Sequence, residues 1–186
     1  MKINNIKLKI RNVWICLLGI LVTIKCIFSP LGIKVLILKI SPSFINLILF
    51  LVVLISPVIF WKPEKSNFMW IKLAYNVIAT IIVLATILLY PIFYSENKYF
   101  MFKSPNGNRN LIVEEKSFLL SGSSYFYEKK FGIFIKSLDK GISTDDGYRP
   151  FSDNQYKLTW IDNSTVKLEY DYGSMGIWKS EIIDLD

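Results

Sequence analysis

Hydrophobic residues are distributed in two contrasting ways along the 186-residue chain. Up to about residue 96 they form three long, nearly uninterrupted runs, which have the length of membrane-spanning helices rather than of buried strands. From residue 97 onward, apolar and polar residues alternate over short segments that end at turn-forming residues, as in strands with one buried face. The pattern therefore predicts a helical membrane domain over residues 1–96 and a small all-β domain over residues 97–186.

The three apolar runs predict transmembrane helices over residues 13–28, 44–61 and 70–94. The third would reach about 37 Å as a helix, enough to cross a bilayer with some tilt, and aromatic residues lie at both of its ends. No small-residue cleavage site follows the first run, so an uncleaved helix is expected rather than a signal peptide. Residues 31–40 are also apolar, and we expect either a plain loop or a short amphipathic segment lying flat in the membrane interface.

Alternating patterns in the second half predict about six antiparallel strands in meander order. They are expected over residues 98–102, 110–118, 124–138, 156–160, 166–172 and 177–185. The stretch 124–138 is interpreted as one long strand or two, with Gly132 as a bulge or a bend. Strands connected in this order form a small antiparallel sheet, a sandwich or a partly open barrel.

Composition supports this division of the chain. Hydrophobic residues make up 52% of the sequence, and the mean hydropathy is +0.38. The net charge of +7 is uneven, because residues 1–96 hold ten Lys/Arg and two Asp/Glu, whereas residues 97–186 hold twelve and thirteen. The excess of positive charge therefore lies beside the apolar runs, where it faces lipid headgroups. No basic stripe is left on the β domain, so nucleic-acid binding is not expected.

Cations that flank the apolar runs predict the orientation of the chain in the membrane. The N-terminal tail carries four of them, and the connection between the second and third runs, with the start of the third, carries three. The connection between the first two runs carries two. Because cations concentrate on the cytoplasmic side, we expect a multi-pass protein of the cell membrane with a cytoplasmic N-terminus and an extracellular C-terminal domain.

Catalytic chemistry has little support in the residue types. The chain has no histidine, which is the commonest general base and metal ligand. Cys16 and Cys26 lie on one predicted helix, about 15 Å apart, and cannot form a disulfide with each other. Residues 121–124, SGSS, would need a buried lysine to activate a serine. We therefore predict no catalytic residue, no cofactor and no metal site, and we do not expect an enzyme.

The stretch STDDGYRPF, residues 143–151, is the candidate site for binding a partner. In one interpretation it is a tight turn in which Asp145 or Asp146 bridges Arg149. In the other it is a docking loop, because an exposed tyrosine next to an arginine, here Tyr148 and Arg149, is typical of binding hot spots. Both interpretations stay open at the level of the sequence.

Two sharper roles for this stretch are excluded by spacing. If Gly147 were the glycine of a helix-loop-helix calcium loop, acids would be needed near positions 142 and 144, which hold Ile142 and Thr144. The two aspartates are adjacent and would point in different directions in extended chain, whereas paired acid/base carboxylates must converge on one bond. Elsewhere, Tyr125, Tyr127 and Trp178 are expected to pack on the core rather than to bind sugars or peptides.

Four stretches of the second half resemble a family of uncharacterised, membrane-anchored proteins, with a domain of unknown function, from low-GC Gram-positive bacteria. They are SPNGNRNLIVEE, TDDGYRPF, YKLTW and VKLEYDYGSMGIWKSEI. The resemblance covers about residues 95–186 and does not extend to the three apolar runs. It implies a bacterial cell envelope and a small extracytoplasmic domain, and it assigns no catalytic residue.

Taken together, these features predict an integral membrane protein that presents an extracytoplasmic β domain to a partner at the bacterial cell envelope. The partner is expected to be a protein, a peptide or a glycan, and self-protection against a secreted toxin, an immunity role, is one concrete form. The alternative is an accessory subunit of a membrane transport complex, with the helices as the working part.

Overall fold

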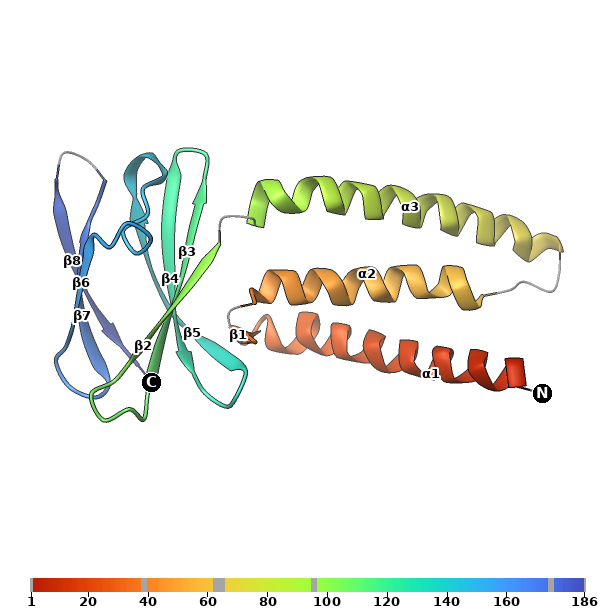
Figure 1. The fold of residues 1–186 in the computed structure, drawn as a ribbon, viewed down its shortest axis with the longest axis horizontal. Helices are drawn as coiled ribbons and strands as arrows, with labels where there is room; N and C mark the ends of the chain where they lie inside the picture. The colour runs from red at the N-terminus through yellow and green to blue at the C-terminus, as the bar shows by residue number, and fades with distance from the viewer. Residues whose placement is uncertain (1, 38–39, 62–65, 95–96, 174–175, 186) are drawn as a thin grey trace.

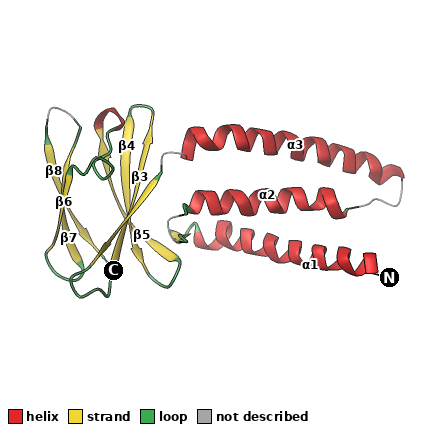
Figure 2. Ribbon diagram, in the orientation of Figure 1, coloured by secondary structure: helices red, strands yellow, loops and turns green. Residues whose placement is uncertain are grey.

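The computed structural model describes residues 2–37, 40–61, 66–94, 97–173 and 176–185. Three long helices lie side by side at one end of the molecule, and two stacked β-sheets lie at the other (Figures 1 and 2). This arrangement confirms the predicted division into a helical first half and an antiparallel β domain in the second half.

The helices are α1 (Lys2–Thr23), which continues into a π-helical turn (Ile24–Phe28), α2 (Pro42–Phe60) and α3 (Ser66–Tyr94). Their apolar parts are Leu8–Phe28, Pro42–Phe60 and Phe68–Tyr94. Each is long and apolar enough to cross a membrane, so the three predicted helices are confirmed in number and place.

Polar groups on aromatic side chains connect neighbouring helices. The Trp14 indole N–H on α1 donates to the carbonyl oxygen of Val53 on α2, at 2.8 Å. The Tyr75 hydroxyl on α3 donates to the carbonyl oxygen of Leu54 at 2.6 Å. In a hydrocarbon environment such groups need a protein partner, so these bonds fix α2 between the other two helices.

The ends of the helices sort into two groups (Figure 1). The N-terminal end of α1, the end of α2 and the start of α3 lie together, away from the sheets. The connection from α1 to α2 and the end of α3 lie next to the sheets. The described helix ends that border the two cation-rich regions are therefore on the same side, opposite the β domain.

The β domain is a sandwich, one of the three shapes that the sequence left open. The first sheet contains β2 (Lys98–Lys103), β3 (Asn110–Phe118), β4 (Ser121–Lys129) and β5 (Phe134–Thr144). The second contains β6 (Tyr156–Trp160), β7 (Thr165–Asp171) and β8 (Trp178–Asp184). The stretch 124–138 forms two strands, and Gly132 lies in the turn between them with φ of 52°.

The core of the sandwich is built from alternate residues of both sheets. Its buried members include Leu111, Val113, Phe126 and Ile142 from the first sheet and Val166, Leu168, Tyr170 and Ile183 from the second. Phe151, from the connection between the sheets, lies at the centre. Its ring centroid is 4.7 Å from that of Tyr156 and 6.5 Å from that of Phe126. For β6 and β7, the period-two pattern identified the buried face correctly.

A short strand from the membrane half completes the first sheet. Strand β1 (Ile33–Val35) pairs antiparallel with β5, giving the order β1-β5-β4-β3-β2. Residues 33–35 therefore form a strand, and the expectation that residues 31–40 lie flat in the membrane interface stays a prediction, with residues 38–39 outside the described part. A strand forms because apolar side chains flank Lys34 with period two and β5 offers an unpaired edge. The membrane half and the β domain thus share one sheet.

Candidate functional site

The stretch STDDGYRPF, residues 143–151, forms the tight turn that leaves β5. Asp145–Gly147 make one 3-10 turn, in which Asp146 has φ of 50° and Gly147 has φ of 67°. The backbone N–H of Tyr148 donates to the carbonyl oxygen of Asp145 at 2.9 Å and closes the turn. The turn interpretation therefore holds for the backbone of this stretch, although the left-handed conformation begins one residue before the glycine.

The four candidate binding residues differ in exposure. Asp145 and Asp146 are exposed, whereas Tyr148 and Arg149 are half-buried. Tyr148 packs against the backbone of Gly173, where an added Cβ would lie 2.6 Å from the Tyr148 Cβ. Tyr148 thus has a packing role that the sequence did not show, and the residue as a whole remains partly accessible. Binding through these four residues and the predicted bridge to Arg149 stay predictions.

A buried carboxylate holds the far end of the same stretch. Glu115, whose residue is 1% exposed, accepts hydrogen bonds from the backbone N–H groups of Phe151 at 2.8 Å and Ser152 at 3.0 Å, and from the Ser152 hydroxyl. Burial raises the pKa of Glu115 above its ordinary value, against the opposite effect of these hydrogen bonds. Because Phe151 fills the core, Glu115 fixes the connection between the two sheets.

The turn predicts a pair of matched glycine variants. Gly147→Val is expected to lower the free energy of unfolding by about 2–4 kcal/mol, because φ is positive and an added Cβ would lie 2.9 Å from the Leu119 carbonyl oxygen and the Ser117 hydroxyl. Gly107 has φ of 72°, but its added Cβ would meet no described atom within 4 Å. Gly107→Val should therefore cost only the backbone strain, about 1–2 kcal/mol. Denaturant unfolding of the full chain in detergent measures both, and equal losses would contradict the close packing at the turn.

A second buried glutamate connects β1 to the sheet. Glu114, also 1% exposed, accepts hydrogen bonds from the hydroxyls of Tyr99 at 2.5 Å and Tyr127 at 2.7 Å and from the Lys34 ammonium at 2.9 Å. The Lys116 ammonium lies 3.4 Å away. Burial by itself would raise the pKa of Glu114, but the two lysines and the hydrogen bonds outweigh it and hold that pKa below its ordinary value. We call these five residues the Glu114 cluster.

The Glu114 cluster makes the α1–α2 connection part of the β domain. Lys34 belongs to β1, and its ammonium contacts the Tyr127 hydroxyl at 2.6 Å and lies 4.6 Å from the centroid of the same ring. On this face of the sheet, Ile112, Tyr127 and Ile135 form a small buried group with Leu36 packed against it. One signal of this second buried face is present in the sequence, because the apolar run LIV at residues 111–113 is continuous rather than alternating.

The outer face of the second sheet carries an exposed tryptophan. Trp178 is 51% exposed at the start of β8, so the expectation that it packs on the core is wrong, as it is for the exposed Tyr125, whereas Tyr127 is buried as expected. Together with Lys157, Glu169, Lys179 and Ser180, Trp178 lines a shallow pocket of about 410 Å³. We call these five residues the Trp178 face.

The Trp178 face adjoins the STDDGYRPF turn. The carbonyl oxygen of Tyr172, just after β7, accepts the backbone N–H of Asp145 at 2.9 Å. The N–H of Tyr172 donates to the carbonyl oxygen of Ile177 at 2.8 Å, directly before Trp178. The exposed carboxylates of the turn and the exposed indole therefore lie at the same end of the sandwich, where one partner can contact both.

Neither a metal-binding arrangement nor a similar known protein assigns a function to these sites. Among the described residues, no group of three or more His, Cys, Asp or Glu side chains is arranged to hold a metal ion. The chain matches no protein-family model, no curated protein and no solved structure.

Proposed function

We propose that this chain is an integral protein of a bacterial cell membrane that holds a β domain on the extracellular side, where it binds a protein, peptide or glycan of the cell envelope. The surplus of flanking cations at the opposite end of the helices supports this orientation. The bacterial envelope follows from the sequence resemblance. Protection of the cell against a secreted toxin is one form that such binding takes.

The observation that carries the proposal is the exposure of Trp178. Its sheet is the layer farthest from the helices, so the outer face points away from the membrane (Figure 1). Tryptophan is seldom left this exposed in a monomeric domain, and it is enriched among residues that dominate binding energy. Its ring can stack on a sugar or fill an apolar pocket while the indole N–H forms a hydrogen bond.

The edge of the same sheet favours recognition by side chains over addition of a partner strand. Along β8, Glu181 lies on the same side as the buried Ile183, and an inward-pointing charge on an edge strand opposes pairing with another chain. Lys140 also donates to the carbonyl oxygen of Ile182 at 2.8 Å and occupies part of that edge. A partner is therefore expected to lie on the Trp178 face and not along the strand.

Attachment of the domain at two places gives this face a fixed direction. The sheet is connected to the membrane half through α3 and β2 and again through β1, and the Glu114 cluster reinforces the second connection. A domain on a single flexible linker would lose more orientational freedom on binding. Presentation at a fixed angle therefore lowers the entropic cost of recognising a partner in the cell wall or on the membrane.

Capture of a partner in intact cells tests the proposal. With a membrane-impermeant crosslinker, Trp178→Ala is expected to reduce the recovered complex about tenfold or more, because loss of an anchoring aromatic commonly costs at least about 2 kcal/mol. The melting temperature should not change. Phe131→Ala is the matched control, since Phe131 is 83% exposed but lies on the β4–β5 turn. If Trp178→Ala captures the partner as well as the wild type does, the Trp178 face is not the binding face. If crosslinking occurs only after cell lysis, the β domain does not lie on the extracellular side.

One observation favours the alternative, an accessory subunit of a transport complex. A groove of about 500 Å³ between α2 and α3 is lined in part by Lys25, Asn46, Thr86 and Tyr90. Polar groups at this depth of a bilayer commonly bind a neighbouring helix. A partner that is retained by Trp178→Ala but lost on Asn46→Leu would support this second function.

A further inference from the structure

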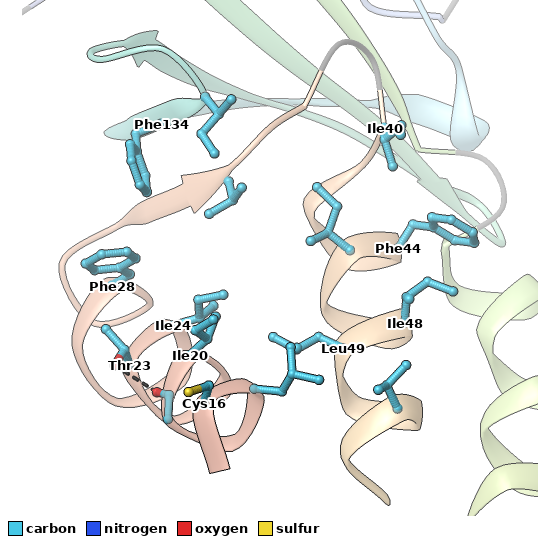
Figure 3. A pocket seen from close by; sticks show the side chains of 16 residues that line it. Cys16, Ile20, Thr23, Ile24, Phe28, Ile40, Phe44, Ile48, Leu49 and Phe134 are labelled. Atoms are coloured by element: carbon cyan, nitrogen blue, oxygen red, sulfur yellow. Dashed lines mark hydrogen bonds between the residues drawn. The ribbon is translucent and has the colours of Figure 1, made fainter. Parts of the chain in front are cut away.

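A large apolar groove lies between α1 and α2, at the end of the helices that meets the β domain (Figure 3). Its volume is about 1130 Å³, above the range of roughly 300–1,000 Å³ usual for small-ligand pockets. Cys16, Ile20 and Phe28 line the α1 side, and Phe44 and Leu49 line the α2 side. The occupant must therefore be predominantly hydrocarbon.

Among the described lining residues, Thr23 carries the one hydroxyl, and that hydroxyl is already hydrogen-bonded. The Thr23 hydroxyl donates to the carbonyl oxygen of Gly19 within α1, at 2.9 Å, as the dashed line in Figure 3 shows. A ligand that carries hydrogen-bonding groups along its length would bury them here without compensation. The groove thus selects against a polar peptide and for an acyl chain.

The length of the groove matches one leaflet of a bilayer. Its lining extends along the first helix from Cys16 to Phe28, which is about 18 Å at 1.5 Å per residue. Half of a hydrocarbon core of about 30 Å is about 15 Å, whereas a partner transmembrane helix would need the full thickness. The groove therefore fits the chains of a lipid in the leaflet on the side of the β domain.

A separate polar pocket lies beside the end of the groove that meets β5. At that end the rings of Phe28 and Phe134 meet edge to face, with centroids 5.6 Å apart. Lys136 follows two residues later on the same side of β5, about 7 Å along the strand. It lines a polar pocket of about 370 Å³ together with Lys34, Tyr127, Ser137 and the carboxylate of Asp139. The Lys34 ammonium and the Tyr127 hydroxyl of this pocket are already bonded to Glu114, so Lys136 is the cation placed to meet a phosphate headgroup there.

We propose that this groove is a lipid-binding site, which takes the acyl chains of one anionic phospholipid from the leaflet on the side of the β domain and binds its phosphate near Lys136. The assignment goes beyond binding of an envelope partner and does not depend on it. A lipid in this position contacts α1, α2, β1 and β5 at once, so it becomes part of the joint between the helices and the sheet.

Photolabelling tests the chain-binding part. The full-length protein in nanodiscs is irradiated with phosphatidylglycerol that carries a diazirine in its acyl chain, and adducts are mapped by mass spectrometry. Adducts are expected on the groove-lining residues of α1 and α2. An added Cβ at Gly19 meets no described atom within 4 Å, so the ring in Gly19→Phe enters the groove without a backbone clash. We expect it to reduce labelling about tenfold. Val22→Phe, on the same helix but outside the lining, should leave labelling unchanged.

Headgroup chemistry is tested with a second lipid and a second variant. Phosphatidylcholine with the same photoreactive chain should label the groove less than phosphatidylglycerol does. Lys136→Gln should reduce the ratio of phosphatidylglycerol to phosphatidylcholine labelling about fivefold, which is the effect of one interfacial cation. Adducts spread evenly over the three helices, or labelling insensitive to Gly19→Phe, would show surrounding lipid only and overturn the proposal. Equal labelling by the two lipids, or a second protein chain crosslinked in the groove, would overturn it as well.

Discussion

Glu114→Ala is expected to lower the free energy of unfolding of the β domain by about 3–5 kcal/mol, the range seen when one partner of a buried ion pair is removed. The carboxylate accepts hydrogen bonds from two tyrosine hydroxyls and from the Lys34 ammonium, all within 2.9 Å. Its loss leaves Lys34 and both hydroxyls without this acceptor in a poorly hydrated space. Denaturant unfolding in detergent, followed by tryptophan fluorescence, measures the change.

Glu169→Ala provides the control for this prediction. The Glu169 carboxylate pairs with the Lys167 ammonium at the same distance, 2.9 Å, but on the solvent side of β7. Exposed pairs contribute about 0–1 kcal/mol, so this variant should unfold almost as the wild type does. If the two variants lose the same free energy of unfolding, burial of Glu114 does not strengthen its hydrogen bonds and ion pair.

The pH dependence of unfolding separates Glu114 from its neighbour. The pKa of Glu114 is held below its ordinary value of 4.5, so its stabilisation is fully present above pH 4.5 and is lost as the pH falls through the lower folded pKa. The pKa of Glu115 is raised, so its contribution is present below pH 4.5 and is lost as the pH rises through the folded pKa. Glu114→Gln should therefore flatten the loss of stability in acid, and Glu115→Gln should not.

Residues 97–186 expressed without the helices are expected to be rich in β-structure but less stable and no longer strictly monomeric. Removal of β1 leaves the β5 edge at residues 134–136 unpaired, takes Leu36 away from Ile135 and deprives Glu114 of Lys34. A loss of about 2–3 kcal/mol from these contacts corresponds to a melting temperature roughly 10–20 °C lower for a domain of this size. The open edge also offers a site for pairing with a second copy.

Restoring the missing strand is the control. The same domain carrying residues 29–37 through a glycine-serine linker should regain a monomeric state in size-exclusion chromatography and most of the lost melting temperature. A bare domain that is already monomeric and as stable as the version with the strand would show that β1 contributes nothing to the sheet. Circular dichroism reports whether the strands form in both cases.

The sequence predicts those elements whose pattern is local. The hairpin of β6 and β7 was expected over residues 156–160 and 166–172, and it lies at Tyr156–Trp160 and Thr165–Asp171. Its alternation is complete within each strand, and the second strand is bounded by turn residues. Strand β1 has only three residues, and its partner is far away in the chain, so no local pattern distinguishes it from an apolar loop.

Burial of the two glutamates depends on what covers both faces of β3. Glu114 and Glu115 point to opposite faces, and a strand at the surface would leave at least one of them in water. Here the second sheet covers one face, and β1 with its neighbours covers the other. Neither cover can be inferred from the residues of β3 alone. The same holds for Trp178, because an aromatic residue in an alternating strand does not indicate which face of a sandwich is outside.

The pairing of β1 with β5 also orders the assembly of the protein in the membrane. Ile33 pairs with Lys136, roughly a hundred residues later, so β1 is synthesised long before its partner. Closing such a long loop is slow, and the strand remains unpaired until α3 has crossed the bilayer and the domain has emerged. A chain in which α3 fails to cross leaves β5 on the wrong side and cannot complete the sheet. Completion of the five-stranded sheet thus requires that the α1–α2 connection and the β domain lie on the same side of the membrane.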